Sequence, residues 1–322
     1  MARFDNLDNW LRWQETLHPD PVDLGLERVG EVARRLDLLS PPAIVISVAG
    51  TNGKGSSVAM LDAIYRAAGY CTATYTSPHL LVYNERIRLD GSPVDDARLC
   101  DAFARIDDAR GDISLTYFEF GTLAALDIFR TEKPDVILLE VGMGGRLDAV
   151  NIIDADAALV TSIDIDHSEW LGEDRETIAR EKAGIFRHGH PAVCADPDPP
   201  LSLRQSALSL GARWQALGEH FHWAAESRGW RWVSDGRTFA DLPLPALPGR
   251  HQLDNAAGVI MITELLQTRL PVPQEACAAG LRSVALDGRC QVIPGPVEHV
   301  LDVAHNRASA QRLAAWLADR PV

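Results

Sequence analysis

A glycine-rich segment with one lysine and one serine has the clearest chemical potential in this sequence. The run Gly50–Ser56 follows a β-branched stretch at 43–49 and precedes a helical apolar pattern. A strand, a glycine-rich turn and a helix in this order point backbone N–H groups and a helix N-terminus at a phosphate. Lys54 would bring a positive charge to the outer phosphates, and Ser56 or Thr51 would place an oxygen near Mg²⁺. We therefore predict a nucleotide phosphate site here.

The segment departs from the common phosphate loop at two positions. The pattern G-x-x-x-x-G-K-[ST] requires glycine at position 48 and serine or threonine at position 55. This chain has Val48 and Gly55 at those positions. A generic GTPase or small-molecule kinase is therefore a poor match, whereas phosphate binding remains a good one.

Composition narrows the class of protein. The 322 residues carry a formal charge of −14, from 31 basic and 45 acidic side chains. Such an acidic chain is a poor partner for nucleic acid. No apolar run approaches transmembrane length, and the N-terminus has no signal-peptide core. Free thiols in a reducing cytoplasm explain the five cysteines best, because their number is odd and they have no C-x-x-C spacing.

Alternating strand and helix patterns predict an α/β fold that begins after two N-terminal helices. A mostly parallel, doubly wound sheet with helices on both faces follows from this alternation, with ligands at the carboxyl ends of its strands. The predicted helices are 7–17, 26–38, 95–109, 118–131 and 175–186, and the predicted strands are 43–49, 72–75, 135–140, 157–163 and 192–194.

The pattern changes in the last third of the chain. Short aromatic strands separated by Gly and Ser turns predict a small antiparallel ribbon near 214–242. Helices at 254–267 and 274–283 follow, then a strand at 297–302 and a helix at 308–318. We expect an ATP-binding domain over 1–285 and the beginning of a second α/β domain over 286–322. Since one strand cannot form a sheet, the expectation is that this second domain is incomplete.

Polar side chains follow three predicted strands, at 75–79, 140–151 and 162–170. Glu140 ends a buried apolar run and precedes a glycine-rich stretch, so a metal or phosphate role is favoured over simple solvation. His167 is open between a metal ligand and a packed side chain, because imidazole is a softer ligand than Mg²⁺ prefers. Lys182 lies in a charge cluster on an amphipathic helix, which by itself predicts a surface lysine.

These motifs together resemble the dihydrofolate synthase/folylpolyglutamate synthase family, relatives of the Mur cell-wall ligases. The resemblance extends from about residue 7 to the end of the chain. Its motifs stand in the family's order and are Gly50–Ser56, Thr76–Leu80, Leu139–Asp148, Asp166–Gly172, Arg180–Phe186 and Leu301–Asn306.

The resemblance implies an ATP-dependent amide ligase. ATP would phosphorylate a carboxylate to an acyl phosphate, which the α-amine of L-glutamate attacks. The implied substrates are 7,8-dihydropteroate, giving dihydrofolate, and tetrahydrofolate, giving polyglutamates. The family also implies a monomer.

The resemblance assigns roles to individual positions. Lys54, His167 and Lys182 would act in catalysis, with Lys182 carbamylated by CO₂ so that it helps to hold a second Mg²⁺. The implied metal ligands are Ser77, Glu140, His167 and Lys182. The implied nucleotide-binding residues are Thr51, Asn52, Gly53, Lys54, Gly55, Ser56, Asn255, Arg289 and Asp302.

Three segments would bind the pteroate group. They comprise Pro21, Val22, Asp23 and Leu24; Thr116, Tyr117, Phe118 and Glu119; and Leu147, Asp148 and Ala149. Aromatic and carboxylate groups suit a flat pterin that forms hydrogen bonds. The runs 23–28 and 115–119 favour the bifunctional bacterial type over a pure folylpolyglutamate synthase.

The sequence also departs from the family. Val150 replaces a usual threonine, Arg307-Ala308 replaces a usual Pro-His, and the C-terminal domain is about a hundred residues shorter than expected. A truncated nucleotide-binding remnant with little turnover is therefore an alternative. A kinase for hydroxyl groups would lack the signatures at 140–148 and 166–172. A Mur ligase for UDP-linked peptides would need a larger N-terminal domain than the 40 or so residues before the loop.

Overall fold

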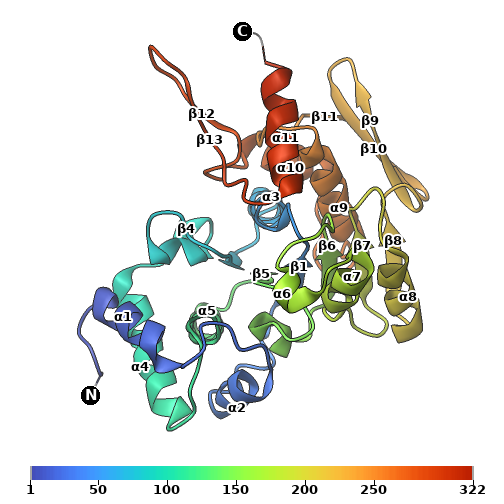
Figure 1. Cartoon of the computed structure of the whole chain (residues 1–322). Coiled ribbons are helices and arrows are strands. Elements are labelled where there is room, and N and C mark those ends of the chain that lie inside the picture. The colour runs from blue at the N-terminus through green and yellow to red at the C-terminus, as the bar shows by residue number, and fades with distance from the viewer. Residues whose placement is uncertain (1, 321–322) are drawn as a thin grey trace.

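A computed structural model describes residues 2–320 and shows an eight-stranded main sheet (Figure 1). The strand order is β4-β3-β2-β5-β1-β6-β7-β8. The strands are β1 (Ile44–Ala49), β2 (Thr72–Tyr75), β3 (Ile87–Leu89), β4 (Ser92–Pro93), β5 (Val136–Glu140), β6 (Ala157–Val160), β7 (Pro191–Cys194) and β8 (Arg213–Ala216).

Six of these strands run parallel, which confirms the predicted mostly parallel α/β sheet. β1 lies between β5 and β6, with Val48 opposite Glu140 on one side and Leu159 on the other. The carboxyl ends of these three strands therefore meet at one edge. The short hairpin β3–β4 extends the sheet antiparallel to β2 and was not predicted, because its segments are too brief to show a period.

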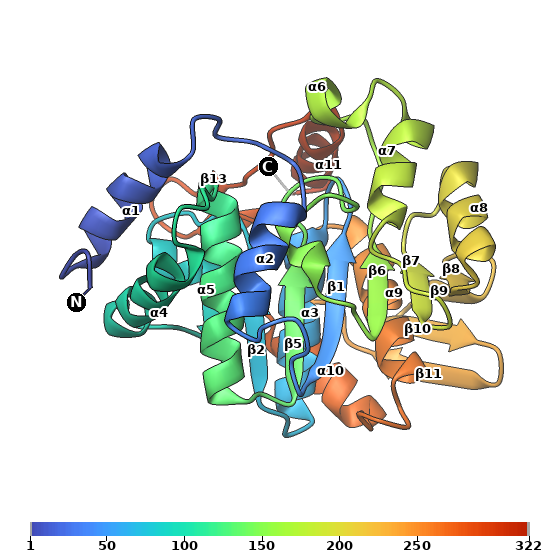
Figure 2. The ribbon, with the colours of Figure 1, turned by 90° about the horizontal axis from the view of Figure 1, so that it is seen from below.

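Helices cover both faces of the sheet (Figure 2). The helices are α1 (Leu7–Leu17), α2 (Glu27–Arg35), α3 (Lys54–Ala67), α4 (Asp96–Arg110), α5 (Tyr117–Glu132), α6 (Ser168–Leu171), α7 (Arg175–Ala183), α8 (Leu201–Leu210), α9 (His251–Leu265), α10 (Gln274–Ser283) and α11 (Arg307–Ala318), with 3₁₀ turns η1 (Tyr83–Arg86) and η2 (Ala149–Ile152). Side-chain caps start several helices: Asn6 accepts from Asn9 N, and Asp95 from Arg98 N.

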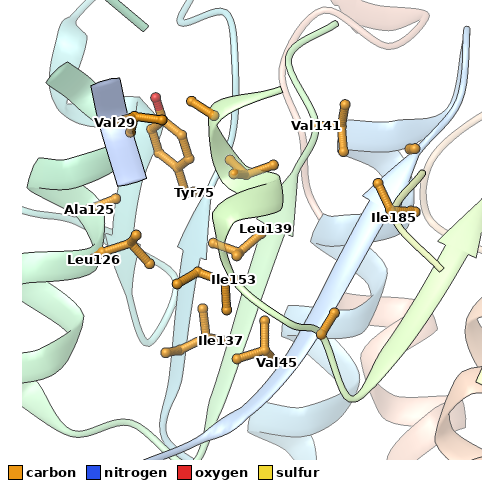
Figure 3. Close-up of a cluster of buried hydrophobic side chains, with 14 of the residues drawn as sticks. Val29, Val45, Tyr75, Ala125, Leu126, Ile137, Leu139, Val141, Ile153 and Ile185 are labelled. Atoms are coloured by element: carbon orange, nitrogen blue, oxygen red, sulfur yellow. The ribbon is translucent and has the colours of Figure 1, made fainter. Parts of the chain in front are cut away.

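The alternation of side chains along each strand divides the core into two clusters. Val45 of β1 and Leu139 of β5 face α2, α5 and η2 (Figure 3), while Ile46 and Leu138 face α3, α9 and α10. All six residues of β1 are buried. The strand that carries the glycine-rich loop is thus held from both faces and by both neighbours, which gives the loop a rigid base.

The antiparallel ribbon is confirmed but begins later than predicted. It comprises β9 (Phe221–Glu226), β10 (Gly229–Ser234) and β11 (Arg237–Leu242). Trp214, which marked the predicted start, lies instead in β8 at the edge of the main sheet, parallel to β7. Its aromatic character suggested the ribbon, whereas burial of its indole beside Phe186 explains its place in the main sheet.

The C-terminal segment holds a second small sheet. β12 (Gln291–Ile293) pairs antiparallel with β13 (His299–Leu301), so the expectation of a lone strand at 297–302 was wrong. The three residues of β12 are too few to show a strand period. No helix within residues 2–320 is both long and apolar enough to cross a membrane.

Candidate active site

The glycine-rich loop connects β1 to α3 in a backbone conformation that only glycine tolerates at two positions. Gly50 has φ +149°, and a Cβ there would lie 1.8 Å from Thr161 Oγ1. Gly53 has φ +100°, and a Cβ there would lie 2.6 Å from Asn255 Oδ1. These close approaches fix the loop against β6 and α9, so that α3 begins at Lys54 with its N-terminus at the sheet edge.

Hydrogen bonds from the segment after β6 hold the loop. Thr51 N donates to Ser162 O at 2.7 Å, and Thr51 Oγ1 both donates to Asp164 O and accepts from Asp164 N, each at 3.0 Å. The Thr51 hydroxyl is thus used to shape the loop. Ser56 remains the better candidate for an oxygen beside a metal, with Gln252 Nε2 3.3 Å from its hydroxyl.

Lys54 folds back over the loop. Its Nζ donates to Gly50 O at 3.1 Å and to Thr51 O at 3.3 Å. Phosphate oxygens are stronger acceptors for an ammonium group than peptide carbonyls are. The side chain is therefore placed where an arriving phosphate can take over its hydrogen bonds.

A cavity of about 530 Å³ opens above the loop. Its walls come from the loop, from the ends of β2 and β5, and from the C-terminal segment. The lining includes the predicted residues Thr51, Asn52, Gly53, Lys54, Gly55, Ser56, Ser77, Glu140, His167, Arg289 and Asp302. The residues that the sequence placed at separate strand ends thus surround one space.

Glu140 is a buried carboxylate on the cavity wall. Its Oε2 accepts from Ser77 N at 3.1 Å. Burial raises the pKa of Glu140, while the positive charges of Lys54, Arg289 and Arg86 and the Ser77 hydrogen bond act in the opposite direction. A buried carboxylate among cations, on the wall of the 530 Å³ cavity, is suited to a metal ion.

His167 and Lys182 meet at a second, small cavity of about 30 Å³, which Lys54 also lines. Lys182 is only 3% exposed, so the expectation of a surface lysine from its charge cluster was wrong. Burial and the nearby Lys54 charge lower the pKa of Lys182 to about 7. His167 is half-exposed. It is the N-cap of α6 and has φ +49°, a left-handed conformation that is uncommon for a residue other than glycine.

The donor set around the loop fits Mg²⁺ better than a closed protein metal site. Within residues 2–320 no group of three or more His, Cys, Asp and Glu side chains converges on one point. Mg²⁺ is commonly held by one or two carboxylates together with substrate phosphates and water. Glu140 and the Ser77 hydroxyl match that pattern.

The predicted nucleotide residues beyond the loop differ in their placement. Arg289 and Asp302 line the cavity. Asn255 is buried behind Gly53 and donates to Gln252 Oε1 at 3.0 Å, so it supports the loop from below. Its role in nucleotide binding stays a prediction.

Four residues at the site were not predicted. His251, Gln252 and Arg312 line the cavity, and Asn306 bonds the loop residue Asn52. Burial and the Arg312 charge lower the pKa of His251 to about 4, so its imidazole is neutral. Asn306 lies in a recognised motif, but the other three carry no sequence signal because only tertiary folding brings α9 and α11 to the loop.

The segments assigned to the pteroate substrate gather on the α5 side of the sheet. Arg28 connects two of them, donating to Asp23 Oδ2 at 2.5 Å and to Glu119 Oε1 at 3.1 Å. Phe118 packs on Gly142, where a Cβ would lie 2.6 Å from Phe118 Cζ. The start of α5 thus reaches the glycine-rich stretch after Glu140.

Several of these residues already have structural partners. Glu119 is buried and accepts from Thr116 N at 2.7 Å, which completes the capping box of α5. Asp148 is buried, accepts from Met143 N at 2.8 Å, and has its pKa raised by burial to about 6. None of the three segments lines the 530 Å³ cavity, and their role in binding substrate stays a prediction. Val150, the departure from the family, is buried in η2.

Comparison with known proteins agrees with this geometry. Residues 48–263 match the Mur ligase middle domain. The dihydrofolate synthase/folylpolyglutamate synthase of Escherichia coli strain K12 is 44% identical over 315 residues, which is 98% of this chain and 73% of that protein. The protein of the same name from Haemophilus influenzae is 40% identical over 329 residues, 97% of this chain and 73% of its own length.

Solved structures show the same relationship. E. coli FolC in complex with DHPP and ADP superposes with a TM-score of 0.95 at 43% identity, covering 100% of this chain and 76% of that one. A bifunctional folylpolyglutamate synthase/dihydrofolate synthase with Mn, AMPPNP and L-glutamate bound gives 0.91 at 46% identity, covering 99% and 76%. The chain therefore belongs to the dihydrofolate synthase/folylpolyglutamate synthase family, with the middle domain of the Mur ligases.

Proposed function

We propose that this chain is an ATP-dependent ligase that joins L-glutamate to the carboxylate of 7,8-dihydropteroate and of tetrahydrofolate. The observation that carries the proposal is the meeting of the loop with Lys54, Glu140 and Lys182 at one sheet edge. Relatives named dihydrofolate synthase/folylpolyglutamate synthase match nearly the whole chain. Relatives have been solved with ADP and with AMPPNP and Mn, which supports ATP and a divalent metal as its ligands.

The chain's residues suit the two steps of such a ligation. In the first, a substrate carboxylate oxygen bonds to the γ-phosphorus of ATP and the bond to ADP breaks, giving an acyl phosphate. In the second, the glutamate amine bonds to the acyl carbon, phosphate leaves and the amine loses a proton. Phosphoryl transfer needs charge neutralisation and positioning above all, and Lys54 and the loop amides supply both.

The metal positions are part of the proposal. Ser77, Glu140 and His167 would hold one Mg²⁺, which neutralises phosphate charge when bound. Lys182, with its pKa lowered to about 7, has a substantial fraction of uncharged amine at neutral pH. Its Nζ could bond to the carbon of CO₂ and release a proton, giving a carbamate whose oxygens would help to hold a second Mg²⁺.

The remaining assignments rest on the same resemblance. Thr51–Ser56, Asn255, Arg289 and Asp302 would bind the nucleotide, and the segments 21–24, 116–119 and 147–149 the pteroate group. The nucleotide domain would cover 1–285, with residues 286–322 belonging to a second domain. We infer a monomer, which the resemblance alone implies. We place it in the cytoplasm, which the five free cysteines support.

Product analysis tests the proposal. The chain is incubated with ATP, Mg²⁺, 7,8-dihydropteroate labelled with heavy oxygen in its carboxylate, and L-glutamate. We expect ADP release that requires both co-substrates, with heavy oxygen appearing in the released phosphate. ADP release without glutamate that continues beyond a single turnover, with no heavy oxygen in the released phosphate, would indicate a kinase. Nucleotide binding without turnover would indicate the remnant, and either result contradicts the ligase.

A further inference from the structure

Arg86 ends η1 with its guanidinium enclosed by aromatic rings. Its Cζ lies 5.4 Å from the ring centroid of Tyr83 and 5.5 Å from that of Tyr117. Its Nε donates to His79 Nδ1 at 2.9 Å. One edge of the guanidinium is thus fixed by His79, and the rings restrict the group further.

This guanidinium has no acidic partner among the residues that the structure describes. No carboxylate oxygen of residues 2–320 lies within 4.0 Å of it. Arg28, Arg110 and Arg175 each pair with at least one carboxylate, whereas Arg289, which lines the cavity, resembles Arg86 in having none among the described residues. Since burying an unpaired charge is costly, an oriented cation of this kind is suited to an external anion.

Arg86 lies close to two of the proposed metal ligands, Ser77 and Glu140. Its carbonyl accepts from Thr76 N at 2.8 Å, which places it beside the segment that carries Ser77. Its charge is also among those that counter the raised pKa of Glu140.

The face of the sheet on which Arg86 lies indicates whether it would bind a nucleotide phosphate or another anion. Arg86 is not part of the lining of the cavity above the phosphate loop. It contacts Tyr117, the first residue of α5, on the face of the sheet where Tyr75 and Phe118 pack together at 5.7 Å between ring centroids (Figure 3 shows Tyr75 on this face). An anion at Arg86 would therefore come from the α5 side, whereas nucleotide phosphates at the glycine-rich loop would lie on the α3 side.

We propose that Arg86 binds the carboxylate of the pteroate or folate substrate and holds it for phosphorylation. Nε is bonded to His79, and the Tyr75 hydroxyl also lies beside the guanidinium. The two terminal nitrogens would bind the two carboxylate oxygens, the paired geometry that arginine favours. Tyr83 and Tyr117 would limit water around the pair. His79 is then a positioning residue. This inference rests on the proposed ligase function and adds to it the residue that recognises the acceptor group.

Binding measurements with paired ligands test this role. Dissociation constants are determined for 7,8-dihydropteroate and for its analogue with hydrogen in place of the carboxylate. The wild type should prefer the carboxylate form by about 10- to 100-fold, the range for a hydrogen-bonded charge. Arg86→Gln should lose most of that preference, and Arg86→Lys should retain part of it.

A matched control removes a charge elsewhere. Arg98→Gln changes an exposed arginine on α4 that pairs with Asp95 and Glu132, and it should keep the wild-type preference. Thermal melting confirms that each variant folds; if Arg86→Gln does not, the comparison rests on Arg86→Lys.

Two outcomes overturn the inference. One is an unchanged carboxylate preference in both Arg86 variants. The other is a weakened affinity for ATP with the preference intact, which would assign the guanidinium to a phosphate. Failure of the ligase function gives a different result, because then the wild type itself forms no glutamate-dependent ADP.

Discussion

The side-chain amides of Asn52 and Asn306 bond each other reciprocally, although 254 positions separate them in the sequence. Asn52 Nδ2 donates to Asn306 Oδ1 at 3.2 Å, and Asn306 Nδ2 donates to Asn52 Oδ1 at 3.1 Å. Asn306 Nδ2 also donates to Asp166 Oδ2 at 2.9 Å. These bonds join the phosphate loop to the segment before His167 and to the start of α11. The position of α11 should therefore affect how the loop binds a nucleotide.

Replacing either asparagine should uncouple the loop from α11. We expect Asn52→Ala to raise the KM for ATP about 2- to 10-fold, the effect of losing neutral hydrogen bonds. A double-mutant cycle on unfolding by urea should give a coupling energy of about 1 kcal/mol. Asn306→Ala should cost about 1 kcal/mol more, because Asn306 Oδ1 also caps α11 by accepting from Ser309 N.

Asp95→Ala is the control for the cap. It removes the N-cap of α4 and should lower stability by a similar amount without changing the KM for ATP. A coupling energy near zero between Asn52 and Asn306 would show that this pair does not couple the phosphate loop to α11.

Lys54→Ala should reduce ADP formation by about 100-fold or more, because phosphoryl transfer loses a positioned positive charge. Steady-state assays of ADP release measure the effect. The melting temperature should change little, since Lys54 bonds only to two carbonyls of its own loop. Near-normal rates would refute the assignment of this loop to ATP.

Lys182→Ala should cripple turnover if a carbamate forms at this residue. A short carboxylate such as acetate should then restore part of the activity, because it can occupy the space of the carbamate. Wild-type activity should fall in CO₂-depleted buffer and recover when bicarbonate is added. An unaffected Lys182→Ala variant would leave Lys182 as a buried lysine with no catalytic part.

The low pKa of Lys182 also predicts a pH dependence of stability. Between about 7 and 10.5 the unfolded chain binds a proton at Lys182 that the folded chain does not. Stability therefore rises with pH across this window through this group. Below it both states are protonated, and the folded state carries the full cost of a buried ammonium group.

Replacing Lys182 by methionine should remove this cost. In CO₂-depleted buffer, Lys182→Met should be more stable than the wild type to urea, most clearly at and below about pH 7, with the difference shrinking toward pH 10. The exposed Lys133 provides the matched control, and Lys133→Met should show no such trend. A difference independent of pH would mean that Lys182 is not held neutral by burial.

Local sequence signals were sufficient for much of this fold. Helix α1 has the predicted bounds, 7–17, because its apolar spacing and the Asn6 cap both act within a few residues. The phosphate loop and Glu140 were equally legible, since each directly follows a buried strand. The short strands β4 and β12 were missed, because two or three residues show no period.

Site residues whose positions depend on tertiary packing could not be predicted from the sequence. Nothing near Lys182 in the sequence shows that α7 directs this ammonium group inward. The charged neighbours Arg180 and Glu181 favoured an exposed position instead. Arg312 and His251 likewise reach the cavity only because α11 and α9 pack around the loop. Contacts between elements distant in sequence decide these positions, and no local pattern records them.

Helix α11 has no buried residue, whereas every residue of β1 is buried. The two sides of the Asn52–Asn306 pair therefore differ in how easily their backbone opens. Amide hydrogens of β1 should exchange with solvent deuterium only on global unfolding, and those of α11 through local opening. Nucleotide binding at the loop should accordingly be visible as slowed exchange in α11, so this helix can report on occupancy of a site that β1 anchors.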